Sequence, residues 1–188
     1  MFKQPSGLMA QWIEKEVFSY VDYFFAERLL KDVGHWDSLV LLCYLLASAR
    51  RGHLSVEITQ QRLSPDPSSF TDERQIVEEI SSCLKKAIFL CPDFLVHRVE
   101  DSSDTCIAKP LYEYKGLWYL HKNWSLETKG LARLKKVARG SLLLKPKAPY
   151  SLSSKLNQEQ KQAALSALHS PLSLISGGPG TGKTFTAS

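Results

Sequence analysis

The segment SLISGGPGTGKTFTAS, residues 173–188, constrains the fold of this chain more than any other part of the sequence. Gly177, four further residues, Gly182, Lys183 and Thr184 match the pattern G-x-x-x-x-G-K-[ST] of a phosphate-binding loop. A short apolar run, Leu172 to Ile175, precedes the loop and predicts a strand. A strand that leads through such a loop into a helix is an α/β unit.

The residue types in this loop suit a nucleoside triphosphate. Glycines let the backbone turn tightly with its N–H groups toward an anion, and a following helix presents its positive end to the same anion. Lys183 brings a compact charge to the terminal phosphates, and the Thr184 hydroxyl completes the coordination of a nucleotide-bound Mg²⁺, so we predict both as catalytic residues. The predicted nucleotide contacts are Gly177, Gly178, Pro179, Gly180, Thr181, Gly182, Lys183 and Thr184. The alternative is a glycine turn that precedes Lys-Thr by chance.

Charge is distributed unevenly along the 188 residues. Residues 1–100 carry 11 basic and 14 acidic side chains, whereas residues 101–188 carry 13 and 5. Nine of the basic residues lie between Lys129 and Lys161, with Glu159 as the one acid among them: Lys129, Arg133, Lys135, Lys136, Arg139, Lys145, Lys147, Lys155 and Lys161. This stretch predicts a solvated face, with contact to a nucleic-acid backbone or to an acidic protein as alternatives.

Neither a membrane segment nor a metal site is indicated. The longest apolar run, Leu39 to Ala47, is far shorter than the roughly twenty residues that cross a bilayer and predicts a buried helix. The start of the chain lacks the features of a signal peptide, so we expect a cytoplasmic protein. The four cysteines form no C-x-x-C pair and are expected to be buried free thiols: Cys43, Cys83, Cys91 and Cys106.

Residues 1–108 are expected to form a small, mainly helical domain. Helical periodicity predicts helices over residues 9–31, from an Asp37 N-cap with Trp36 stapled onto Leu41 to near Gly52, and over 72–87. The alternating segment HLSVEI predicts a strand with Leu54, Val56 and Ile58 on one side, and DFLVHRV predicts another. No catalytic constellation is recognisable in this part of the sequence.

The second half is punctuated by turn and capping signals. PLYEYKGLWYL predicts a hairpin around Lys115-Gly116, followed by a helix that Ser125 caps. Together these form a segment over residues 109–139, and residues 140–156, rich in proline and serine, are a predicted linker. Asn157 then caps a helix in which Gln160 occupies the N3 position, so a capping box explains both residues without a ligand.

These residues resemble the superfamily 1 helicases, in which a glutamine ahead of the phosphate loop, here Gln160, holds the edge of adenine. SLISGGPGTGKTFT, together with PLYEYKGLWYLHKNWSLETKGLARL, is most similar to the RecD family, the alpha subunits of exodeoxyribonuclease V (RecBCD). The specific motifs begin near residue 110, and weaker similarity covers most of the chain. The resemblance implies ATP and Mg²⁺ as cofactors and Gln160 as an adenine contact, a role that its capping role does not exclude.

The resemblance also implies a function and partners. It implies an ATP-dependent 5′-to-3′ DNA helicase of double-strand break repair, acting on double-stranded DNA ends and single-stranded DNA with RecB-like and RecC-like subunits. The expected fold is α/β: a mainly helical partner-docking domain over 1–108, then, over 157–188, the truncated start of a P-loop (RecA-like) motor domain. The magnesium-binding acid, the arginine that reaches the phosphate and the second motor lobe of such an enzyme are missing, so we expect a fragment that is inactive alone.

Two other functions stay open at this stage. The chain could serve only as a module that docks on a partner protein, or it could belong to a different superfamily 1 helicase or P-loop ATPase. An isolated strand before the loop also gains too little burial to order itself, which leaves the shape of the loop open.

Overall fold

The computed structural model describes residues 4–30, 35–100, 108–140 and 152–187. The chain divides into two compact units, residues 1–127 and residues 128–188. Nearly all of the buried apolar side chains belong to the first unit, and Leu156 is the buried apolar side chain of the second among the described residues. Helices and a mixed sheet make the described chain α/β, which confirms the predicted fold class.

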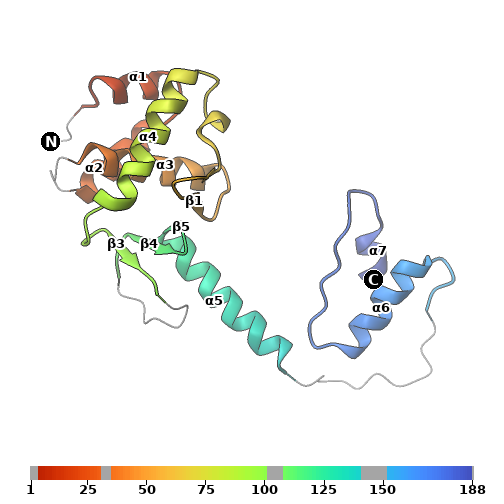
Figure 1. Ribbon diagram of the computed structural model, residues 1–188. Helices are drawn as coiled ribbons and strands as arrows, with labels where there is room; N and C mark the ends of the chain where they lie inside the picture. Colours follow the sequence, from red (N-terminus) through yellow and green to blue (C-terminus); the bar gives the residue numbers. More distant parts are fainter. Residues whose placement is uncertain (1–3, 31–34, 101–107, 141–151, 188) are drawn as a thin grey trace. The chain divides into compact units, whose positions relative to one another are not determined.

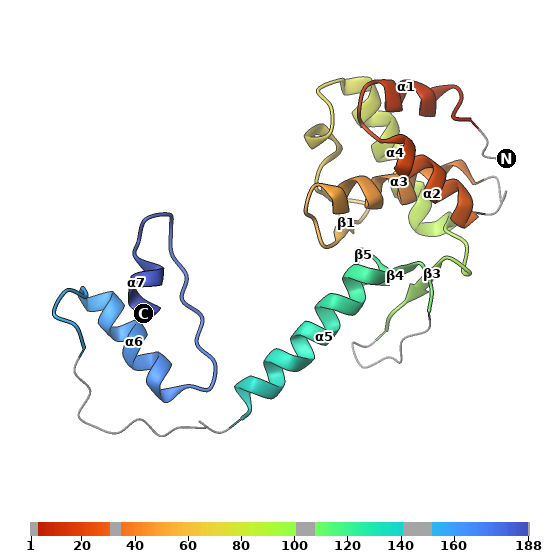
Figure 2. The same cartoon turned by 180° about the vertical axis from the view of Figure 1, so that it is seen from behind.

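Four helices and a short 3₁₀ turn form the helical part of the first unit (Figure 1). They are α1 (Leu8–Glu14), α2 (Tyr20–Leu30), α3 (Trp36–Arg50), η1 (Pro67–Ser69) and α4 (Arg74–Leu90). Helix α3 packs against both α2 and α4. Its predicted buried run is confirmed, since residues 40–44 are fully buried. Figure 2, the view from behind, agrees with Figure 1 that these helices gather on one side of strands β3, β4 and β5.

The sheet of the first unit has five strands in the order β2-β1-β5-β4-β3. They are β1 (Val56–Ile58), β2 (Leu63–Ser64), β3 (Val96–Arg98), β4 (Leu111–Tyr114) and β5 (Leu117–Leu120). Strands β3 and β4 are parallel and the other pairs are antiparallel. The predicted strands in HLSVEI and DFLVHRV are thus confirmed. The predicted hairpin, part of the expected segment over residues 109–139, supplies β4 and β5 of this sheet. The predicted division into domains stays a prediction.

Both faces of the hairpin are covered, because alternate residues of a strand point to opposite sides of the sheet. Leu111 and Trp118 are buried in the main core with the helices. Tyr112 and Tyr119, which pair across the hairpin, lie in a second cluster with Trp124. Trp124 stacks on Tyr112 with 5.6 Å between ring centroids and 9° between ring planes. The start of α5 (His121–Ala138) therefore anchors on the sheet through an aromatic contact.

The hairpin turn has the backbone that its sequence predicts. Lys115 and Gly116 both have positive φ, 52° and 82°, as a two-residue turn between right-twisted strands requires. The backbone N–H of Gly116 donates to the Glu113 carboxylate at 2.8 Å. A Cβ at Gly116 would lie 3.0 Å from Thr59 Cγ2, so the neighbouring loop also favours glycine here. The predicted hairpin around Lys115-Gly116 is confirmed.

The single helix predicted over residues 9–31 is wrong, because α1 ends at Glu14 and α2 begins at Tyr20. Glu16 has φ of 59°, and the turn buries Val17 and Phe18 in the core. Ser19 and Asp22 then cap α2 reciprocally: Ser19 N donates to the Asp22 carboxylate at 2.9 Å, and Asp22 N donates to Ser19 Oγ at 3.2 Å. Helical periodicity passes through this break, and the Ser-x-x-Asp pattern of Ser19 and Asp22, which the prediction from sequence did not use, is the local signal that marks it.

Two predicted helix caps and one predicted strand residue also differ from the structure. His35, not Asp37, is the N-cap residue of α3, and Trp36 in the first turn packs on Trp12 with ring centroids 5.6 Å apart. Helix α5 begins at His121, four residues before the predicted cap Ser125, because Trp124 must reach the sheet. Leu54 is 58% exposed and precedes β1 instead of joining its buried side.

The second unit contains the end of α5, α6 (Gln158–His169) and α7 (Lys183–Ala187). The strand predicted at Leu172 to Ile175 is wrong: no strand is assigned there, and Leu174 is 88% exposed. A strand is stabilised by neighbours that take its backbone hydrogen bonds, and the described part of this unit has no strand to pair with. The predicted linker lies mostly in residues 141–151, outside the described residues.

In the part of the chain that the structure describes, no helix is both long enough and apolar enough to span a bilayer. Three of the expected free thiols, Cys43, Cys83 and Cys91, are confirmed as free and buried, and Cys106 lies outside the described residues.

Candidate nucleotide-binding site

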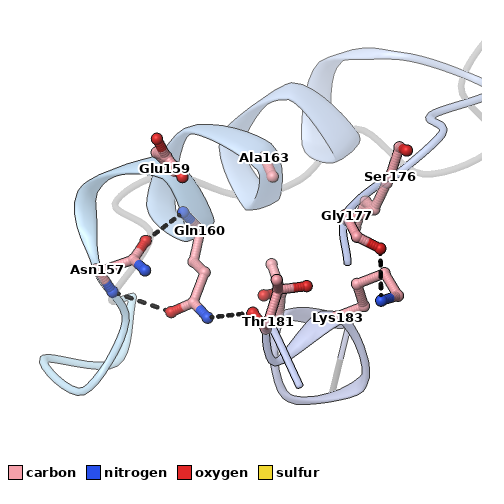
Figure 3. A pocket seen from close by; sticks show the side chains of 10 residues that line it. Asn157, Glu159, Gln160, Ala163, Ser176, Gly177, Thr181 and Lys183 are labelled. Carbon is pink, nitrogen blue, oxygen red and sulfur yellow. Dashed lines mark hydrogen bonds between the residues drawn. The ribbon is translucent and has the colours of Figure 1, made fainter. Parts of the chain in front are cut away.

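The predicted phosphate loop connects the extended segment after α6 to the first turn of α7 (Figure 3). Gly177, Gly178, Pro179, Gly180, Thr181 and Gly182 form the loop, and Lys183 and Thr184 open the helix. Gly180 and Gly182 have φ of 75° and 74°, a region that side chains with a Cβ rarely occupy. A Cβ at Gly177 would lie 2.8 Å from Thr181 Oγ1. Backbone conformation thus favours glycine at positions 180 and 182, and the Thr181 side chain leaves little room for a Cβ at Gly177.

Lys183 folds back over the loop. Its Nζ donates to the backbone oxygens of Gly177 and Gly178, at 2.8 and 2.7 Å. The ammonium therefore lies within the curve of the loop and is held by neutral carbonyl groups. A phosphate is a stronger partner for an ammonium than a carbonyl is, because a charged acceptor roughly doubles the strength of the hydrogen bond.

The loop is closed by two hydroxyl groups. Thr181 Oγ1 donates to Gly178 O at 2.9 Å, across the tip of the loop. Thr186, one turn into α7, donates its hydroxyl to Gly182 O at 3.0 Å. Thr184 is exposed in the first turn of α7. Thr186 was not predicted, and its only sequence signal is a threonine four residues after a glycine at the start of a helix.

Helix α6 presents Gln160 to the loop. The predicted capping box is confirmed: Gln160 N donates to Asn157 Oδ1 at 2.8 Å and Asn157 N donates to Gln160 Oε1 at 3.0 Å. Gln160 Nε2 in addition donates to Thr181 O at 3.2 Å, a contact that the sequence did not predict. Figure 3 shows the side chain lying between the start of α6 and the loop.

These elements surround a cavity of about 320 Å³. Its lining combines the cap and loop residues with apolar and charged side chains: Asn157, Glu159, Gln160, Ala163, Ile175, Ser176, Gly177, Thr181, Lys183 and Thr186. Lys183 brings a positive charge to this lining and Glu159 a negative one. A small polar cavity beside a glycine loop and a lysine fits the phosphates of a nucleotide, and its size is near the lower limit of ligand sites.

The predicted basic stretch is only partly described. Lys129, Arg133 and Lys136 are exposed on one side of α5, and we call these three residues the basic face. Among the ion pairs between described residues, none involves the basic face. Lys145 and Lys147 lie outside the described residues. No group of three or more histidine, cysteine or acidic side chains with the arrangement of a metal site occurs in the described ranges.

A second cavity, of about 550 Å³, lies in the first unit. Apolar side chains from α2, α3 and the hairpin line most of it: Phe25, Leu29, Leu46, Pro110 and Leu120. Lys109 and Lys122 lie at the same cavity. Phe25 is 52% exposed and Val21, one turn before it on α2, is 72% exposed. We call this surface the apolar groove.

Comparison with known proteins finds two relatives of this chain. No family model matches the chain. Over 186 residues it is 28% identical to a protein of Buchnera aphidicola subsp. Schizaphis graminum named RecBCD enzyme subunit RecD. The matched region covers 95% of this chain and 30% of that protein. Over 48 residues it is 54% identical to the ATP-dependent helicase upf1 of Schizosaccharomyces pombe. This match covers 23% of this chain and 5% of that protein.

The chain thus spans less than a third of the length of either relative. The similarity to the RecD subunit extends over nearly the whole chain at low identity, and that to the helicase is short but closer. Together the two relatives support a chain related to the superfamily 1 helicases.

Proposed function

We propose that this chain is the N-terminal part of a RecD-like, ATP-dependent DNA helicase, and that the cavity beside the glycine loop binds the phosphates of ATP. The main observation in support of this proposal is the geometry of the loop, in which Gly180 and Gly182 have positive φ and Lys183 Nζ lies 2.8 Å from Gly177 O. The low-identity similarity to a RecD subunit over 95% of the chain supports the choice of family.

In this proposal ATP bound with Mg²⁺ would supply the terminal phosphoanhydride bond, whose hydrolysis by water drives the motor. Lys183 would exchange the carbonyl groups of Gly177 and Gly178 for the terminal phosphates, and the Thr184 hydroxyl would face the ion. For Lys183 this exchange replaces bonds to neutral oxygens with bonds to charged ones, which favours the bound state. The loop glycines keep side chains out of the space that the phosphates need.

Gln160 is also suited to adenine. A side-chain amide has two acceptor sites on oxygen and two donor hydrogens on nitrogen. The bonds to Asn157 N and Thr181 O use one site on each atom, so one acceptor site on the oxygen and one donor hydrogen on the nitrogen are left. This pair matches the N6 donor and N7 acceptor of adenine. The capping role and the adenine role are therefore compatible in one side chain.

The activity of the whole protein, its polarity and its partners follow from the RecD resemblance and belong to this proposal. They include 5′-to-3′ movement on DNA ends in double-strand break repair, RecB-like and RecC-like subunits, and a cytoplasmic location. The test is ATP binding and DNA-stimulated ATP hydrolysis by the whole protein with and without Lys183→Ala. We expect the variant to lose both, and undiminished turnover would exclude the assigned role of the lysine.

A second candidate function is docking on a partner protein, and the apolar groove favours it. The groove exposes aromatic and aliphatic side chains beside Lys122, whereas the Lys109 ammonium donates to the backbone oxygens of Asp93 and Val96. The groove therefore suits a partner segment with apolar side chains and a carboxylate that pairs with Lys122. Mixing the chain with candidate nuclease and scaffold subunits on a sizing column tests this function. Phe25→Asp should abolish co-elution, whereas Phe89→Asp, at a 72% exposed phenylalanine on α4, should not. Failure of the unmodified chain to co-elute at micromolar concentration contradicts docking.

A further inference from the structure

Gln160 connects two segments that are 21 residues apart in the sequence. Its oxygen is fixed by Asn157 N at the start of α6, and its nitrogen donates to the backbone oxygen of Thr181 in the phosphate loop. The acceptor is a main-chain atom, so this bond acts on the path of the loop and not on a loop side chain. Helix α6 therefore holds the loop through one amide.

The contact is close on both sides. A Cβ at Gly182 would lie 2.8 Å from Gln160 Nε2, so the residue after Thr181 must be a glycine if the amide is to reach the loop. Thr181 connects this contact to the start of the loop, because its hydroxyl donates to Gly178 O at 2.9 Å. The bonds run from Asn157 through Gln160 and Thr181 to Gly178, which spans the loop from its last turn to its first residues.

We propose that Gln160 is a positioning residue for the phosphate loop, and that it preorganises the loop for a polyphosphate whether or not a base is present. The inference rests on the proposed nucleotide site and adds to it. If Gln160 only recognised adenine, its substitution would weaken the binding of those ligands alone that carry the base. Because Gln160 holds Thr181 O, its substitution also weakens the binding of a polyphosphate that has no base.

The physical reason is that few buried apolar contacts hold this loop, whose other side-chain hydrogen bonds come from Thr181, Lys183 and Thr186 of the same local segment. All of its residues from Gly177 to Thr181 are exposed, and the described part of the unit buries almost no apolar side chain that would order it. A segment with few buried contacts opens locally at low free energy. When only a fraction of the molecules has the competent loop, the apparent dissociation constant equals the intrinsic one divided by that fraction, so it rises as the fraction falls. A single hydrogen bond contributes enough to change that fraction about five-fold.

The chain offers substitutions that separate this role from helix capping. Gln160→Glu keeps an oxygen for the capping box, in which glutamate and glutamine are equivalent, but removes the donor to Thr181 O. Gln160→Met removes both functions without adding charge. Gln158→Glu adds the same negative charge two residues away, at an exposed position of the same helical turn, and serves as the control. Circular dichroism verifies that each variant retains its helices.

The first measurement is ¹⁵N relaxation of the Gly180 and Gly182 amides in the nucleotide-free chain. We expect order parameters to fall toward about 0.6 in Gln160→Glu and Gln160→Met, and to stay unchanged in Gln158→Glu. Unchanged order in both Gln160 variants overturns the inference. A loss of order in Gln160→Met alone also overturns it, because the cap would then be the only contribution.

The second measurement is titration with inorganic tripolyphosphate and Mg²⁺, which carry no base, in parallel with ATP. Both Gln160 variants should bind tripolyphosphate about five-fold more weakly than the unmodified chain, and the control should bind equally well. If the Gln160 variants bind ATP more weakly but tripolyphosphate equally well, the inference is overturned, and Gln160 then acts only by recognising adenine. If the unmodified chain binds neither ligand, the proposed function fails, and the relaxation data still decide whether Gln160 orders the loop.

Discussion

Arg50→Met tests the ion pair between α2 and α3, which is the most buried one described in the first unit. The Asp22 carboxylate is 2% exposed and accepts bonds from Arg50 Nε at 3.0 Å, from Arg50 Nη2, and from Ser19 N at 2.9 Å. Methionine keeps the helix propensity and an unbranched apolar stem but removes both charged donors. The buried carboxylate is then left with the cap bond alone.

The expected loss follows from that geometry. Removing one partner of a buried pair costs about 3–5 kcal/mol, because the remaining charge is uncompensated. The guanidinium is 48% exposed, so water can reach part of the vacated space and solvate Asp22. We therefore expect a loss near the lower limit, about 3 kcal/mol in the free energy of unfolding. Such a loss is a large fraction of the stability of a small domain.

Urea unfolding followed by tryptophan fluorescence measures this loss in the first unit, because all four tryptophans, Trp12, Trp36, Trp118 and Trp124, lie within residues 1–127. Arg74→Met is the matched control, since its ion pair with Glu78 lies on one exposed helix face with the side chains 92% and 65% exposed. The control should leave the unfolding midpoint unchanged. Equal effects of the two substitutions would refute the claim that burial of Asp22 makes its pair important.

Three further predictions concern the loop, the thiols and the basic face. Gly182→Ala should weaken nucleotide binding more than Gly180→Ala, because both have positive φ but only a Cβ at 182 meets Gln160 Nε2; equal losses in a titration with ATP would contradict the contact. Burial raises the pKa of Cys83 and of Cys91 from 9.0 to about 11, so the folded state keeps protons that the unfolded state releases. The free energy of unfolding should then fall between pH 9 and 11, by at most about 1.4 kcal/mol per pH unit for each thiol, and urea midpoints should show a shallower fall in the double alanine variant. Changing the three residues of the basic face to glutamine should lower the slope of log affinity for duplex DNA against log salt by about 0.9 for each phosphate that the variant no longer neutralises, and an unchanged slope would identify it as a solvated face.

Where one local rule decided a feature, sequence reasoning found it. The turn at Lys115-Gly116 needs two residues with positive φ, and the cap at Asn157 needs a glutamine three residues later, so both were predictable. The break between α1 and α2 was missed because Val17 continues the apolar period of a helix while it is buried in a turn. The start of α5 was missed because the aromatic contact between Trp124 and the sheet, not Ser125, sets it.

The candidate site divides in the same way. The spacing of glycines, lysine and threonine in the loop is a local pattern, and the positive φ at Gly180 and Gly182 accords with it. The bond from Gln160 to Thr181 O joins residues whose separation in the sequence gives no indication of contact. The position of Lys183 against the loop carbonyls is likewise a property of the folded loop.

The sequence by itself determined the α/β class, the hairpin, the capped helix α6 and the glycine positions of the loop, since each depends on backbone preferences within a few residues. Only the tertiary structure decided that the hairpin completes a five-stranded sheet with both faces covered, and that the run before the loop is not a strand. The physical reason is that strands and buried faces are stabilised by partners distant in the sequence, whereas turns and caps are stabilised by their own neighbours.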